Sequence, residues 1–99
     1  MEMIKTKNGG DLTIALKGRL DTTTAPQLES ELRTALSGIT ELVFDLKDLA
    51  YISSAGLRVL LSAQKTMNRQ GDMIIRNASP DIMDIFEVTG FVDILNIEE

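Results

Sequence analysis

The sequence YISSAGLRVLL occupies residues 51–61 and marks the point where an apolar strand region passes into an apolar helix. Hydroxyl and small residues separate the two apolar parts. A hydroxyl at such a junction can cap the helix by accepting a hydrogen bond from its first turn. It is also accessible to another protein, and a phosphate added there would bring about −1.5 to −2 charges. This segment can therefore serve as a structural joint and as a switch.

The chain before this segment predicts a β-hairpin. Residues 12–17 alternate between large apolar and smaller or more polar side chains, which is typical of a strand with one buried face. Residues 8–11, Asn-Gly-Gly-Asp, form a turn sequence that lets residues 3–7 pair back onto that strand.

A helix is expected next, over about residues 25–36. Thr24 and Gln27 have the spacing of a capping box, and Pro26 falls in the first turn, where its missing N–H does no harm. Gly38 is expected to end this helix.

The second half alternates strands with helices. Residues 42–44 predict a strand buried on both faces, and residues 46–52 a short irregular segment that keeps its leucines and isoleucine buried. A helix over about residues 55–70, ending at Gly71, is followed by a strand at residues 73–75. The core-facing residues of that helix are expected to be Leu57, Leu60, Leu61 and Met67.

The C-terminal part predicts one more helix. Ser79 is expected to cap it, Pro80 to occupy its first position and Gly90 to end it. Residues 91–97 would return as a short terminal segment or edge strand. Together these elements predict one small α/β domain over residues 1–99, with a mixed central sheet covered by helices and right-handed crossovers.

Composition excludes several kinds of site. The 99 residues contain no cysteine and no histidine, which removes thiolate chemistry, the usual zinc ligands and any Ser-His-Asp triad. The net charge of −5 repels nucleic acid and anionic membranes at long range. No apolar run approaches the roughly 20 residues that span a bilayer. We therefore expect a cytoplasmic protein with no direct nucleic-acid binding, no membrane insertion and no cofactor.

Three segments resemble the STAS domain family, specifically its stand-alone anti-sigma factor antagonists. Residues 45–57, DLKDLAYISSAGL, resemble the family signature. Residues 18–21, GRLD, are similar to the family's Gly-x-Leu/Ile-Asp element before the first helix, and residues 78–91 are similar to its C-terminal helix. The likeness covers almost the whole chain, and the motifs follow the family's order and spacing. It implies a STAS domain over residues 1–99.

The resemblance also implies a mechanism. In this family the serine two positions before the glycine is phosphorylated, which assigns the acceptor to Ser54. The unmodified protein binds an anti-sigma factor with serine kinase activity and so frees a sigma factor. Phosphorylation ends the complex, and a phosphatase acting on phospho-Ser54 restores it. Many such members carry Asp directly before the serine, whereas Ser53 stands there in this chain and offers a second acceptor.

We expect the loops before the two helices to lie together at one end of the sheet, because parallel strands place their C-termini there. Ala55 and Gly56 would leave this surface sterically open to a kinase backbone. The expected partner-binding residues are Asp21, Thr22, Ser53, Ser54, Gly56, Leu57 and Arg58.

Each of these residues also has a purely structural interpretation. Ser54 or Ser53 could be only a cap, and Thr22 only a turn hydroxyl. Asp21 could shape its turn or contact the partner. Arg58, four residues after Ser54 on the same helix face, could be solvated or could contact a phosphate or a partner's acid.

Two other functions remain open at this point. The chain could be a STAS subunit that is not phosphorylated and serves an ABC-transporter or stressosome-like complex. It could instead be an enzyme with Ser54 as nucleophile, but it lacks the Gly-x-Ser-x-Gly elbow, a histidine base and a Walker-type phosphate loop.

Overall fold

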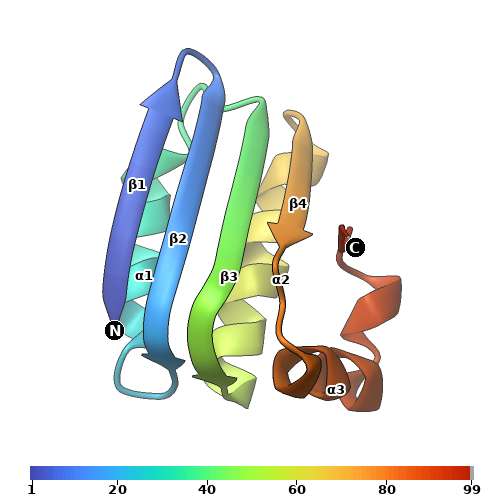
Figure 1. The fold of residues 1–99 in the computed structure, drawn as a ribbon. Helices are drawn as coiled ribbons and strands as arrows, with labels where there is room; N and C mark the ends of the chain where they lie inside the picture. Colours follow the sequence, from blue (N-terminus) through green and yellow to red (C-terminus); the bar gives the residue numbers. More distant parts are fainter. Residues whose placement is uncertain (99) are drawn as a thin grey trace.

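The computed structural model describes residues 1–98, which form a four-stranded mixed sheet in the order β1-β2-β3-β4 (Figure 1). β1 (Glu2–Asn8) and β2 (Asp11–Leu20) are antiparallel, so the predicted hairpin is confirmed. β3 (Glu41–Ile52) runs parallel to β2, and β4 (Asp72–Arg76) runs parallel to β3.

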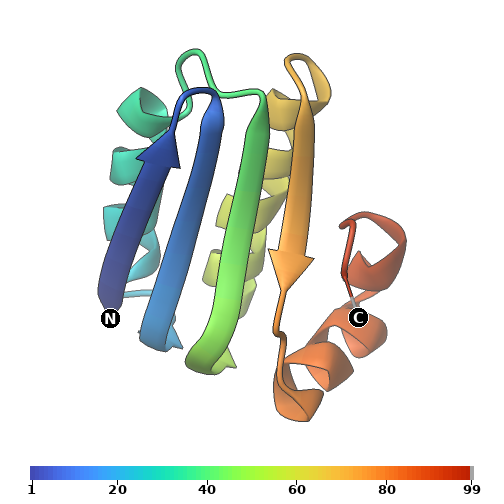
Figure 2. The same ribbon diagram turned by 45° about the horizontal axis from the view of Figure 1, so that its top comes forward.

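Two helices link the parallel strands and cover one face of the sheet. α1 (Ala25–Ala35) joins β2 to β3, and α2 (Ser54–Asn68) joins β3 to β4. Both crossovers step across the sheet in the same direction, so right-handed connections place both helices on the same side. Figure 2 shows them side by side behind the strands. The expected α/β fold is confirmed.

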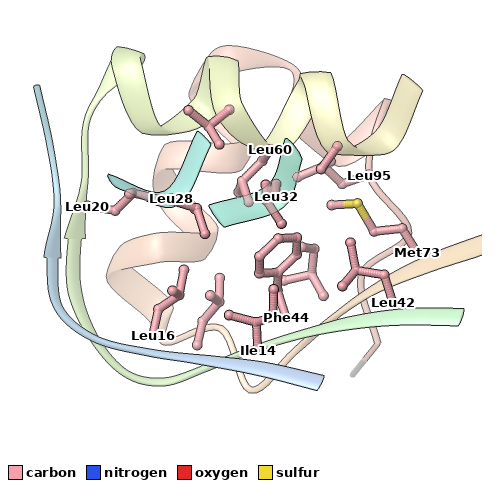
Figure 3. Packing of buried hydrophobic residues seen from close by; sticks show 14 of the residues in the cluster. Ile14, Leu16, Leu20, Leu28, Leu32, Leu42, Phe44, Leu60, Met73 and Leu95 are labelled. Carbon is pink, nitrogen blue, oxygen red and sulfur yellow. The ribbon is translucent and has the colours of Figure 1, made fainter. Parts of the chain in front are cut away.

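The hydrophobic core lies between this sheet face and the helices (Figure 3). Ile14 and Phe44 point from the strands toward Leu28 and Leu60 of the helices, and all four side chains are fully buried. Leu61 does not join this buried set as predicted and is only half-buried, because α2 turns Val59 and Ala63 toward the core instead.

β3 continues through residues 46–52, so the predicted irregular segment is wrong. Ala15 and Lys17 of β2 pair with Asp45 and Asp48, which leaves one extra residue in β3. A second extra residue separates the partners of Gly18 and Arg19. Such bulges break the two-residue period of a strand, so Leu46, Leu49 and Ile52 are all buried although they are three residues apart.

The C-terminal part closes the edge of the sheet beside β4. α3 (Pro80–Thr89) is capped as predicted, since Ser79 Oγ accepts from the Ile82 N–H at 3.2 Å and Gly90 ends the helix with φ +80°. A short 3-10 helix, η1 (Phe91–Asp93), follows. The alternative of an edge strand over residues 91–97 is wrong except for one parallel bridge between Ile75 and Ile97.

Within residues 1–98, no helix is both long and apolar enough to cross a membrane.

Candidate functional site

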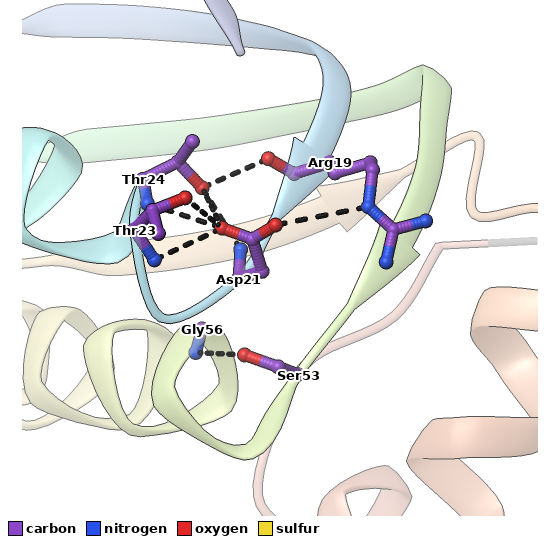
Figure 4. Close-up of polar contacts among 6 residues, drawn as sticks. All are labelled: Arg19, Asp21, Thr23, Thr24, Ser53 and Gly56. Carbon is purple, nitrogen blue, oxygen red and sulfur yellow. Dashed lines mark hydrogen bonds and ion pairs between the residues drawn. The ribbon is translucent and has the colours of Figure 1, made fainter.

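The predicted site residues gather where β2 and β3 end. Leu20 pairs with Ile52, and the backbone N–H of Ser53 donates to the Leu20 carbonyl at 2.9 Å. The loops that enter α1 and α2 therefore start side by side, as Figure 4 shows for Asp21 and Ser53. This confirms the expectation that both loops lie at the same end of the sheet.

The two serines of the second loop have different roles. Ser53 is the residue that caps α2, with its Oγ accepting from the Gly56 N–H at 3.4 Å. Ser54 is the first helical residue and is exposed. The structural role of a capping hydroxyl thus belongs to Ser53, which leaves the exposed Ser54 without that role.

Asp21 organises the turn that leads into α1. Its Oδ1 accepts from the Thr23 hydroxyl at 2.7 Å, from the Thr23 N–H at 3.0 Å and from the Thr24 N–H at 3.2 Å. The hydroxyl of Thr23, helped by the two backbone N–H groups, lowers the pKa of Asp21 from 3.8 to about 2. Asp21 is therefore a firmly ionised turn former at neutral pH.

The predicted capping box of α1 does not form. The Thr24 hydroxyl donates to the Arg19 carbonyl and accepts from the Asp21 N–H, both at 2.8 Å. Its side chain makes no cap hydrogen bond to the helix, because Asp21 already holds it in the turn (Figure 4). Gln27 is left exposed, without the reciprocal bond that a capping box requires.

Arg19 and Tyr51 form a surface pair that the sequence analysis did not identify. The Arg19 guanidinium lies 4.4 Å from the centre of the Tyr51 ring, and its Nε is 3.7 Å from Asp21 Oδ2. The two residues are neighbours in the β2–β3 register only because β3 contains two extra residues. Sequence offers no direct signal for those insertions, so this pairing could not be read from it.

Gly56 and Leu57 were expected among the partner-binding residues, but both are buried and cannot form an exposed contact surface. A Cβ on Gly56 would lie 2.7 Å from Leu20 Cγ and 2.8 Å from Ile52 Cγ1. The expectation that Gly56 leaves the surface open is therefore wrong, because this glycine lets α2 pack closely on the strand ends. Leu57 is a core residue, as its place in the apolar pattern predicted, and is only 5% exposed.

Thr22 and Arg58 are exposed and lie at a groove between the two helices. Two adjoining hollows, of about 540 and 450 Å³, share Glu29, Arg33, Arg58 and Val59. We call them the α1–α2 groove. Thr22 and Ala55 line the end of it that adjoins the Ser53–Ser54 loop.

The site as a whole presents an exposed serine, an ionised carboxylate and three exposed arginines, Arg19, Arg33 and Arg58. In the part of the chain that the structure describes, no group of three or more acidic, histidine or cysteine residues could hold a metal ion. The arrangement suits recognition by another protein and acceptance of a group on Ser54.

Comparison with known proteins gives consistent matches over nearly the full length. The family model of the STAS domain matches residues 2–99. The putative anti-sigma factor antagonist BtrV of Bordetella bronchiseptica is 36% identical, over 98% of this chain and 85% of that protein. The anti-sigma-B factor antagonist of Bacillus subtilis is 30% identical, over 92% of this chain and 84% of that protein.

A solved structure shares the fold. It is that of a putative anti-sigma factor antagonist from Thermotoga maritima, with a TM-score of 0.89 and 14% sequence identity. The match covers 98% of this chain and 86% of that chain.

Proposed function

Because the chain belongs to the STAS domain family, we propose that it is an anti-sigma factor antagonist controlled by phosphorylation of Ser54. It binds an anti-sigma factor and so frees a sigma factor for transcription. Relatives named as anti-sigma factor antagonists, matched at 36% and 30% identity over most of their length, support the antagonist function. It acts as a binding module in the cytoplasm, where transcription takes place.

The exposure of Ser54 beside the capping residue Ser53 is the observation that carries the switch. A phosphate on Ser54 would sit at the N-terminus of α2, where an anion gains about 0.3–1 kcal/mol from the helix dipole at exposed positions. The modification therefore leaves the fold intact. Its effect falls on the partner, which must accommodate or repel about −1.5 to −2 charges.

The partner is an anti-sigma factor with serine kinase activity, and a phosphatase acting on phospho-Ser54 restores the complex. The contact surface comprises the exposed Thr22, Ser54 and Arg58, together with the partly exposed Asp21 and Ser53. Gly56 and Leu57 are buried and do not contact the partner directly. They support the contact surface by setting how α2 packs on the strand ends.

Calorimetric titration with the cognate anti-sigma factor, identified by a pull-down from the native cell, tests the proposal. Ser54→Asp should weaken binding at least tenfold, about 1.4 kcal/mol. Its melting temperature should stay close to that of the unmodified protein. Ser54→Ala, which adds no charge, is the matched control and should bind nearly as well as the wild type. Affinity lost only in proportion to a loss of fold contradicts the proposal, and so does a complete absence of binding.

A further inference from the structure

The α1–α2 groove has one cation whose charge is not matched by a neighbour. Arg33 pairs with Glu29 across one turn of α1, at 2.9 Å. Within residues 1–98, no ion pair of Arg58 is found. The charged side chains that line the groove are these three, so its net charge is +1 in a protein of net charge −5. An acidic segment of another protein is complementary to this groove.

The floor of the groove is apolar and its far end is fixed. It is lined by Leu32 of α1, by Leu36, which follows α1, and by Val59 and Ala63 of α2. Gln70 Nε2 donates to the carbonyls of Leu36 at 2.6 Å and Ile39 at 2.7 Å, which ties the end of α2 to the end of α1. These two hydrogen bonds fix one end of the groove, which reduces the ordering cost of binding a partner there.

Arg58 also lies within reach of the proposed phosphorylation site. Ser54 and Arg58 are four residues apart on α2, and both are exposed. Side chains at this spacing are neighbours on a helix surface, with Cβ atoms about 5–6 Å apart. A guanidinium at that position can form a charge-assisted hydrogen bond with a phosphate.

We propose that Arg58 is the element that couples Ser54 to the groove. In the unmodified protein Arg58 binds a carboxylate of an acidic segment of the anti-sigma factor that is seated in the groove. In the phosphorylated protein the phosphate on Ser54 binds the same guanidinium and displaces that carboxylate. This inference rests on the proposed function and adds to it the chemistry of the partner segment and the reason that the complex ends.

Charge arithmetic supports the competition. Glu29, Arg33 and Arg58 give the groove a charge of +1, and a phosphate of about −1.5 to −2 turns this to about −0.5 to −1. The phosphate is attached to the same helix, so it competes at a high effective concentration. The modified groove then repels the acidic segment that it bound before.

The phosphate–arginine contact can be tested without any partner. We would prepare the protein with phosphoserine at position 54 and titrate it by phosphorus NMR, in the wild type, in Arg58→Gln and in Arg58→Lys. The phosphate pKa, ordinarily about 6, should be lower in the wild type than in Arg58→Gln by about 0.3 units or more. Arg58→Lys should retain part of that shift, and 1 M salt should reduce it.

Arg69→Gln is the matched control, because Arg69 follows the last residue of α2 and does not line the groove. It should leave the phosphate pKa unchanged. Equal pKa values in the wild type and Arg58→Gln would overturn the contact. Arg58 is exposed, so its replacement is expected to keep the fold, and a thermal melt checks this.

Affinity for the anti-sigma factor then separates this inference from the proposed function. Arg58→Gln should weaken binding of the unmodified protein by about 3–10-fold, whereas Arg69→Gln should not. Phosphorylation should weaken binding less in Arg58→Gln than in the wild type. An equal loss in both backgrounds would overturn the coupling through Arg58 but would leave the phosphorylation switch standing. No loss in either background would overturn the phosphorylation switch itself.

Discussion

The backbone N–H of Gly56 donates a hydrogen bond to the hydroxyl of Ser53, at 3.4 Å. This contact assigns the cap of α2 to the first of the two adjacent serines. The second, Ser54, is then the first residue of the helix and is exposed. Two residues of the same type thus separate into a structural one and one available for chemistry.

Replacing each serine by alanine should reveal this difference. Ser53→Ala removes the cap and should lower the free energy of unfolding by about 0.5–1 kcal/mol, in the lower part of the usual range because the bond is long. Ser54→Ala should change it by less than about 0.5 kcal/mol. Urea unfolding measures both values. If Ser54→Ala loses more stability than Ser53→Ala, the assignment of the cap to Ser53 is wrong.

Gly56→Ala should destabilise the protein although alanine is the better helix former. The added Cβ would be 2.7 Å from Leu20 Cγ and 3.0 Å from the Leu20 carbonyl oxygen, so the strand end or α2 must shift. Overpacking of this kind costs about 1–3 kcal/mol, more than the 0.5–1 kcal/mol gained from helix propensity. Denaturant unfolding gives the sign, and a stabilised variant would contradict the close packing.

Stability at low pH should depend on Asp21. Its pKa is lowered to about 2 in the folded protein, against about 3.9 in an unfolded chain. A lowered folded-state pKa contributes stability that is fully present above the unfolded value. That contribution is lost as the pH falls through about 4 toward 2. The stability difference between wild type and Asp21→Asn should therefore shrink over this window.

Chemical denaturation at a series of pH values between 6 and 2 measures that difference. Asp84→Asn, which removes an exposed carboxylate of α3, is the control for losing one acidic group. A difference between wild type and Asp21→Asn that stays constant down to pH 2 would show that the turn does not favour the ionised carboxylate.

Gln70 and Gln27 should respond very differently to replacement by alanine. Gln70 Nε2 satisfies two carbonyls, those of Leu36 and Ile39, so Gln70→Ala should cost about 1–3 kcal/mol. Gln27 has no capping-box bond, and Gln27→Ala should stay within about 0.5 kcal/mol of the wild type. Thermal unfolding of both variants checks the pair. A substantial loss for Gln27→Ala would mean that the capping box forms after all.

Local patterns of the sequence predicted most of the fold. The alternation in residues 12–17, the Gly-containing turn and the Ser79-Pro80 pair each act over a few residues, and the structure has the corresponding strand, hairpin and helix start. The prediction was wrong for residues 46–52. There two extra residues in β3 changed the spacing of buried side chains from two to three, which only the pairing with β2 explains.

The sequence predicted where the candidate site lies, but only some of its individual contacts. That Asp21 and Ser53 lie together followed from the parallel topology. The Thr24 capping box was displaced by Asp21, whose carboxylate accepts hydrogen bonds from N–H and O–H groups of Thr23 and Thr24. The stacking of Arg19 on Tyr51 and the burial of Gly56 depend on contacts between distant segments, which a local pattern does not encode.

Mapping the phosphate is the most direct test of the switch. The protein would be incubated with its cognate anti-sigma factor and ATP and analysed by tandem mass spectrometry, with Ser53→Ala and Ser54→Ala treated in parallel. The account predicts one phosphate on Ser54, retained in Ser53→Ala and absent from Ser54→Ala. Phosphate found on Ser53 alone, or on neither serine, would contradict it.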